Sequence, residues 1–119
     1  MSEGIIKMLE YPSDSEMADN LGTSPVISLE NDLWKRSISH SVGKEDLVLT
    51  YDETGFVCWK AYFENRLILS SSRDQARLIT VWSKDGEAYI AIDFEGEFGK
   101  GRVTVRLYPD IYIEDFQRL

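Results

Sequence analysis

Residues 78–108 constrain the fold of this chain more than any other segment, because they predict three consecutive antiparallel strands. Apolar residues alternate with polar ones in residues 79–83 and 88–94, as in strands with one buried face. Between these runs lies the pair Asp85-Gly86, which suits a two-residue type I′ turn because both central residues of that turn need a positive φ. The turn predicts which side chains of the hairpin face each other.

This first hairpin has one aliphatic face and one aromatic face. If Lys84 faces Glu87, the register pairs Trp82 with Tyr89 on the aromatic face. On the other face it pairs four aliphatic side chains, Val81 with Ile90 and Ile79 with Ile92. We therefore expect the aliphatic face to lie in the core.

A second hairpin follows across the glycine-rich segment 96–101, which we interpret as a flexible hairpin loop. Pairing Glu95 with Arg102 places Tyr89 opposite Tyr108. The result is a predicted aromatic row of Trp82, Tyr89 and Tyr108, flanked by the charged residues Asp93, Glu95, Arg102 and Arg106. This row is either an exposed binding surface or a core face covered by the N-terminal helix or another strand.

The remaining chain predicts a mainly β fold, with α+β as the alternative. Residues 1–24 form a separate N-terminal segment in which Ser13 and Glu16 make a capping box and Gly22 ends a short helix. This segment either packs on the domain or stays flexible beside it. Residues 25–119 predict one domain, a single antiparallel sheet or open barrel of about six to eight strands.

Three local expectations concern the middle of the chain. Residues 56–63 are apolar at most positions, so we expect both faces of that strand to be covered. Trp59 and Trp34 are expected in the core, and residues 30–40 are interpreted as a strand. Ser71 or Ser72 together with Gln75 predicts a single helical turn.

Composition indicates an ordinary globular protein. The chain has 119 residues, of which 43% are hydrophobic and 29% charged, a balance typical of one folded domain. It contains no run of about 18 apolar residues for a membrane span, and Glu3 stands where a signal peptide would be basic. The single cysteine, Cys58, excludes an intrachain disulfide. We therefore expect a cytoplasmic protein without membrane association.

The formal net charge of −8 is concentrated at the two ends of the sequence. Residues 1–24 carry five acids and one base, residues 85–115 carry eight acids and three bases, and residues 25–84 are balanced. Such a charge distribution repels phosphate backbones and disfavours direct binding of nucleic acid. It favours a basic protein partner, although acidic surfaces also serve solubility alone.

Nucleophilic and metal chemistry find little support in the residue inventory. A Cys-His pair has only Cys58 and His40 available, and Cys58 lies within a predicted strand without a helix N-terminus to stabilise a thiolate. We therefore predict a buried, unreactive cysteine. One histidine and one cysteine in different segments also leave only oxygen ligands for a metal, so we expect neither a metal nor another cofactor.

Paired carboxylates offer an alternative. Asp93 and Glu95 project to one side of their strand, and acids about 5 to 9 Å apart can hydrolyse glycosides. An ordinary cross-strand ion pair between Glu95 and Arg102 explains the same residues without catalysis.

The sequence supports three functional hypotheses. The first is a non-enzymatic, acidic protein-binding module, such as an immunity or inhibitor protein that masks a basic toxin or nuclease surface. Its partner-binding residues would be Trp82, Tyr89, Tyr108, Asp93 and Glu95, and a homodimer is also compatible with such a face. The second is a small-ligand or carbohydrate binder lined by Trp59, Tyr62 and Trp82. The third is a hydrolase that uses Asp93 and Glu95.

Overall fold

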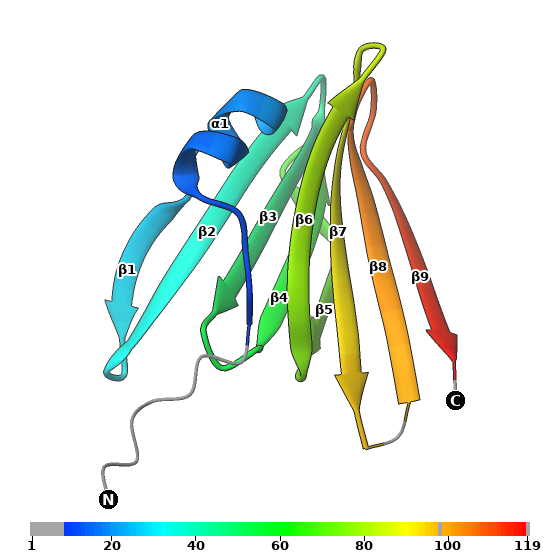
Figure 1. Cartoon of the computed structure of the whole chain (residues 1–119). Coiled ribbons are helices and arrows are strands. Elements are labelled where there is room, and N and C mark those ends of the chain that lie inside the picture. Colours follow the sequence, from blue (N-terminus) through cyan, green and yellow to red (C-terminus); the bar gives the residue numbers. More distant parts are fainter. Residues whose placement is uncertain (1–8, 98, 119) are drawn as a thin grey trace, which may run out of the picture.

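The computed structural model describes residues 9–97 and 99–118, and in these residues it contains one helix and nine strands (Figure 1). The strands form two antiparallel sheets, β1-β2-β3-β4-β5 and β6-β7-β8-β9. The mainly β prediction with a short N-terminal helix is confirmed, whereas the single sheet of six to eight strands becomes two sheets. The elements are α1 (Asp14–Leu21), β1 (Val26–Glu30), β2 (Leu33–Val42), β3 (Glu45–Asp52), β4 (Val57–Phe63), β5 (Arg66–Arg73), β6 (Ala76–Lys84), β7 (Glu87–Gly96), β8 (Gly99–Tyr108) and β9 (Tyr112–Arg118).

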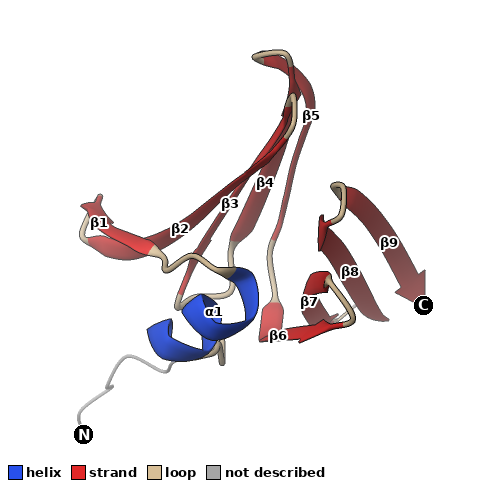
Figure 2. Cartoon of the chain, turned by 90° about the horizontal axis from the view of Figure 1, so that it is seen from above, coloured by secondary structure: helices blue, strands red, loops and turns tan. Residues whose placement is uncertain are grey.

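The two sheets enclose one hydrophobic core. Inward-facing aliphatic and aromatic side chains of both sheets pack together, among them Leu47, Leu49, Trp59, Ile90 and Val105. Figure 2 shows that the two sheets spread apart from each other. The helix α1 lies between β6 and the β1–β2 side of the five-stranded sheet. Within the described part of the chain, no helix has the length and apolarity needed to cross a membrane.

The N-terminal segment packs on this sandwich through α1 and through hydrogen bonds ahead of it. The predicted capping box is present, because Ser13 Oγ accepts from the Glu16 amide at 3.2 Å, and Gly22 ends the helix at φ 75°. Met17 and Leu21 are buried in the common core. Ahead of the helix, the Ile79 amide donates to the Glu10 carbonyl at 2.8 Å. The division of the chain at residue 24 stays a prediction.

The register predicted for the first hairpin is confirmed. β6 and β7 pair Lys84 with Glu87 and Trp82 with Tyr89. Asp85 and Gly86 have φ values of 53° and 79°, as a type I′ turn requires.

The register predicted for the second hairpin is wrong. Glu95 pairs with Lys100 rather than with Arg102, and Arg102 pairs with Asp93. The prediction failed because the glycines extend the two strands instead of forming a loop: Gly96 pairs with Gly99. A Cβ at Gly101 would lie only 3.0 Å from the Phe116 carbonyl oxygen of β9, so close strand packing accounts for glycine there.

Two expectations for the five-stranded sheet are also wrong. The covered face of β4 carries Val57 and Trp59, but Lys60 on its other face is exposed, because no second layer covers the outside of this sheet in the described residues. The helical turn predicted at residues 71–75 does not form, since β5 continues to Arg73 and Gln75 adopts a positive φ of 68° in the connection to β6.

Candidate functional site

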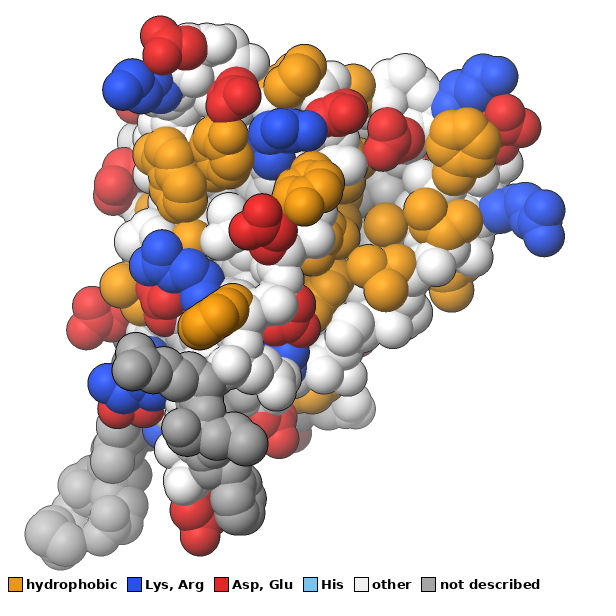
Figure 3. All heavy atoms as spheres, turned by 90° about the vertical axis from the view of Figure 1, so that its right-hand side faces the viewer, with side chains coloured by type: hydrophobic (Ala, Val, Ile, Leu, Met, Phe, Trp, Pro, Cys, Tyr) orange, Lys and Arg blue, Asp and Glu red, His pale blue; other side chains and the backbone are white. Residues whose placement is uncertain are grey.

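The outer surface of the four-stranded sheet carries most of the predicted site residues, and we call it the aromatic face. Side chains that are directly paired across strands project to the same face of a sheet. The pairing therefore aligns four side chains across β6, β7, β8 and β9: Trp82, Tyr89, Arg106 and Tyr112. Figure 3 shows the side of the molecule on which β9 lies, where hydrophobic side chains alternate with charged ones.

The row is held together by ring stacking. The rings of Trp82 and Tyr89 stack with centroids 5.1 Å apart at an angle of 11°, and the Arg106 guanidinium lies 5.4 Å from the Tyr112 ring centroid. Trp82 is 38% exposed and Tyr112 is 53% exposed. The alternative that α1 covers this face is therefore wrong, because α1 packs into the core instead. These side chains form a preassembled, partly exposed aromatic surface of the kind enriched at binding sites.

Tyr108 does not belong to this row, and its prediction is wrong. A bulge between Ala88 and Tyr89 places Tyr108 opposite Ala88, whose side chain is buried. Tyr108 thereby faces the five-stranded sheet. Its ring makes an edge-to-face contact with the ring of His40, with the two ring centroids 4.8 Å apart. A bulge inserts one residue and reverses the alternation beyond it, which is why strict alternation misplaced this side chain.

The carboxylates of the aromatic face are engaged with cations of β8. Asp93 accepts two hydrogen bonds from Arg102, at 2.7 and 3.0 Å, and these bonds raise the pKa of Arg102. Glu95 lies 3.8 Å from Lys100. The ion pair anticipated between Glu95 and Arg102 does not form, and two other cross-strand pairs, Glu95 with Lys100 and Asp93 with Arg102, take its place. Such pairing supports a structural role for both acids over the hydrolase hypothesis.

A third acid interacts with the aromatic row itself. Tyr89 Oη donates a hydrogen bond of 2.5 Å to Glu87, and this bond raises the pKa of Tyr89. On the far side of the row, Arg106 forms an ion pair with Asp110. Glu87 and Arg106 each have a polar partner within the chain, so the face combines apolar rings with engaged charged groups.

The residues proposed for a ligand-binding barrel lie on separate surfaces. Trp59 is buried between the sheets, as expected for a core residue. Tyr62 lies on the outer face of the five-stranded sheet, and Trp82 on the aromatic face. These three side chains therefore cannot line one common cavity.

Cys58 is not buried as predicted. It pairs with Thr50 on the uncovered outer face of the five-stranded sheet and is partly exposed. His40 is buried on the opposite face, where its Nε2 lies 3.1 Å from the Leu107 carbonyl oxygen. The two side chains are on opposite sides of one sheet, which excludes a Cys-His pair in this conformation.

The partly exposed position of Cys58 predicts its labelling behaviour. We expect a thiol reagent such as DTNB to modify the native protein completely without prior unfolding, and Cys58→Ser to change stability by less than about 0.5 kcal/mol. The measurement is the labelling rate with and without denaturant. A native thiol that reacts only as fast as the protein unfolds would contradict the exposure described above.

A second surface, which was not predicted from the sequence, lies on the hairpin formed by β1 and β2. Ile27, Leu29 and Trp34 project to the same side of this hairpin and are 45%, 54% and 60% exposed. Trp34 was predicted in the core, and that prediction is wrong because the hairpin extends beyond the area covered by the four-stranded sheet (Figure 2). The pairing of β1 with β2 brings these residues to one face, and nothing in the sequence indicates that the face lacks a cover.

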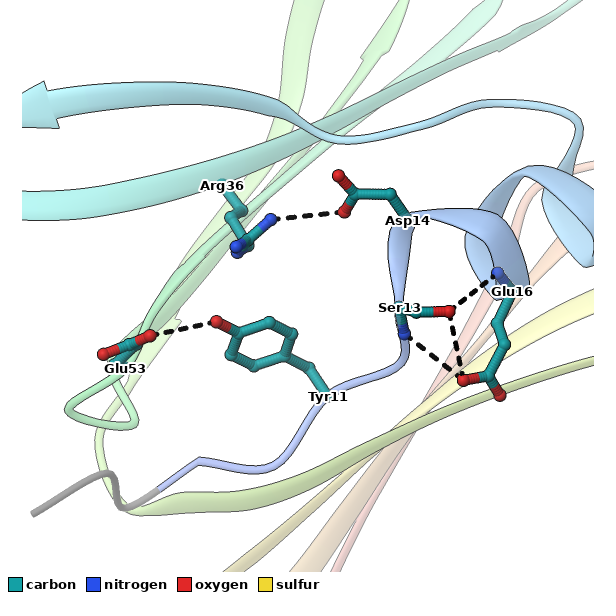
Figure 4. A network of polar contacts seen from close by, with 6 residues as sticks. All are labelled: Tyr11, Ser13, Asp14, Glu16, Arg36 and Glu53. Carbon is teal, nitrogen blue, oxygen red and sulfur yellow. Dashed lines mark hydrogen bonds and ion pairs between the residues drawn. The ribbon is translucent and has the colours of Figure 1, made fainter.

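Between this hairpin and the N-terminal segment lies a cavity of about 390 Å³, which we call the wing cleft. Figure 4 shows the polar contacts beside it: Arg36 forms an ion pair with Asp14 at 3.2 Å, and Tyr11 Oη donates to Glu53 at 3.1 Å. The Arg36 guanidinium also lies 4.9 Å from the Tyr11 ring centroid. The cleft is lined by Tyr11, Ile27, Trp34, Arg36, Tyr51, Asp52 and Glu53.

Comparison with solved structures finds a similar fold. The chain superposes with a TM-score of 0.80 on a chain of the contact-dependent growth inhibition toxin–immunity protein complex from Klebsiella pneumoniae 342. The match covers 95% of this chain and 100% of that chain, at 16% sequence identity. At this identity the likeness establishes a common fold. No protein-family model matches the sequence, and no curated protein matches it significantly.

Proposed function

We propose that this protein is an immunity protein, a non-enzymatic inhibitor that binds and neutralises a protein toxin in the cytoplasm. The observation that carries the proposal is the fold shared over nearly the whole chain with a member of a toxin–immunity protein complex. Because that complex has two kinds of member, a second observation is needed to choose between them.

The charge of the chain favours the inhibitor role. A net charge of −8 accelerates association with a basic protein through long-range attraction and repels the phosphates of nucleic acids. An inhibitor of a basic toxin gains from both effects. A toxin that acted on nucleic acid would be opposed by the same charge.

The aromatic face is the proposed toxin-binding surface. Trp82, Tyr89 and Tyr112 offer large apolar rings whose positions are already fixed by stacking and cross-strand pairing. Preorganised aromatic side chains lose little entropy on binding, which is why they dominate binding energies at interfaces. Asp93 and Glu95 belong to the rim of this surface, whereas Tyr108 is turned away from it.

A neutralisation experiment tests the proposal. We expect the product of the reading frame immediately upstream to arrest bacterial growth when expressed alone, and co-expression of this protein to restore growth. The two purified proteins should form a complex, with a dissociation constant that rises with salt concentration. A growth-arresting neighbour that this protein neither binds nor neutralises would contradict the proposal.

A further inference from the structure

The wing cleft combines an apolar wall with acidic groups, and its chemistry suggests what it can bind. Its wall is formed by Trp34 and Ile27, which the rest of the chain leaves 60% and 45% exposed. Large apolar side chains exposed side by side at a cavity are typical of binding surfaces.

The charges at the cleft are not balanced. The described residues of its lining include one cation, Arg36, and two anions, Asp52 and Glu53. The charge of Arg36 is compensated by Asp14, and the aromatic ring of Tyr11 lies beneath its guanidinium. This compensation leaves the lining with excess negative charge.

The two acids differ in their availability. Asp52 is buried, and its Oδ1 accepts from the Thr54 amide at 2.9 Å and from the Thr54 hydroxyl at 2.5 Å, so it is committed to the turn after β3. Glu53 is exposed, and its carboxylate accepts a hydrogen bond from Tyr11 Oη through Oε1. A carboxylate can accept several hydrogen bonds, so Glu53 retains capacity for a further donor.

The buried Tyr51 hydroxyl adds a second polar group behind this wall. Among the residues that the structure describes, this hydroxyl has no hydrogen-bond partner, and burial raises its pKa so that it stays protonated. A buried polar group without a partner carries a free-energy cost that a bound group or water can relieve.

We infer that the wing cleft binds a lysine or arginine side chain of the toxin. The aliphatic stem packs on Ile27 and Trp34, and the cationic head lies by the indole face and the Glu53 carboxylate. Trp is the strongest cation–π acceptor among the side chains, and a basic side chain has both the stem and the charge that this lining complements. This inference rests on the proposed function and adds a second contact surface, separate from the aromatic face.

A ligand titration tests the cleft without the toxin. N-acetylarginine amide is compared with N-acetylcitrulline amide, its neutral analogue of the same shape, and with N-acetylglutamate amide. We expect the arginine probe to shift the Trp34 indole N–H resonance saturably, about five to ten times more tightly than the citrulline probe. Trp34→Phe assigns the resonance, and Glu53→Gln should remove the preference for arginine over citrulline.

Each other result of the titration contradicts the inference. Equal binding of the arginine and citrulline probes would show that charge is not recognised, and preferred binding of the glutamate probe would assign the cleft to an anion. An absence of saturable binding would remove the cleft as a cation site. The remaining alternative is that a second copy of this chain occupies the cleft. Sedimentation of the wild-type protein and of Trp34→Ala tests it, because a wild-type dimer that the substitution dissociates would place the second copy there.

The toxin complex provides the second test. Glu53→Gln and Trp34→Ala should each weaken toxin affinity about tenfold while leaving the unfolding midpoint of the free protein nearly unchanged, since both side chains are exposed. Glu64→Gln is the matched control, because Glu64 is an exposed, ion-paired acid beyond the opposite end of the same sheet. If the wild-type protein binds the toxin and both variants bind it with the same affinity, the cleft contact alone is refuted. If the wild-type protein does not bind the toxin, the proposed function is refuted.

Discussion

Alanine in place of Trp82 or Tyr89 should raise the dissociation rate of the toxin complex about thirtyfold or more, equivalent to about 2 kcal/mol. The two rings stack at 5.1 Å, so each substitution removes contact area and also releases the remaining ring from its fixed position. Association should change much less, because encounter depends on charge rather than on these rings. Surface plasmon resonance with the upstream gene product separates the two rates.

Charge variants of the same face should show the opposite behaviour. Asp93→Asn and Glu95→Gln should slow association a few-fold at low salt and leave dissociation nearly unchanged, because rim charges act mainly on the rate of encounter. Tyr62→Ala is the control for the Trp82 and Tyr89 substitutions. It should leave both rates unchanged, since Tyr62 lies on the outer face of the other sheet.

Stability measurements decide how an unexpected result is interpreted. If the Trp82 and Tyr89 variants unfold more readily but release the toxin at the wild-type rate, the stacked rings serve only the fold. The toxin-binding surface would then lie elsewhere, with the acidic N-terminal residues Asp14, Glu16 and Asp19 as the next candidates.

Local chemistry explains which parts of the fold were predictable. The Asp85-Gly86 turn determines its own φ values and hence the register of β6 and β7, so Trp82 and Tyr89 were paired correctly. The glycines of residues 96–101 were misinterpreted because glycine serves both flexible loops and close strand contacts. That ambiguity shifted the second hairpin and put Tyr108 where Arg106 lies.

Whether a sheet face is buried is harder to predict from sequence than which side chains share that face. Trp34 was predicted in the core, but whether a strand face is buried depends on where the opposite sheet ends, and Trp34 lies beyond that sheet. The same limit applies to Cys58, which is partly exposed because no second layer covers the outside of its sheet in the described residues. The wing cleft was likewise not predictable, because it depends on how the N-terminal segment around Tyr11 lies against the five-stranded sheet.

Met17→Ala should destabilise the whole protein by about 2 to 4 kcal/mol, the largest loss we expect from a single truncation in the N-terminal segment. Met17 is fully buried, and the helix that carries it packs against β6 and β7 at the open side of the sandwich. Truncation leaves a cavity in the core between the helix and β6 and β7, so the helix and the sheets should lose stability together.

Urea unfolding followed by tryptophan fluorescence and far-UV circular dichroism measures this effect. The two signals should give one common transition, moved to lower urea, while Asp19→Ala in the same helix should change stability by less than about 0.5 kcal/mol because Asp19 is exposed. A Met17→Ala protein whose sheets unfold at the wild-type urea concentration would instead mean that residues 1–24 pack as a dispensable attachment. Such a result would favour a domain boundary at residue 24, and it would separate the acidic N-terminal segment from the stability of both proposed binding surfaces.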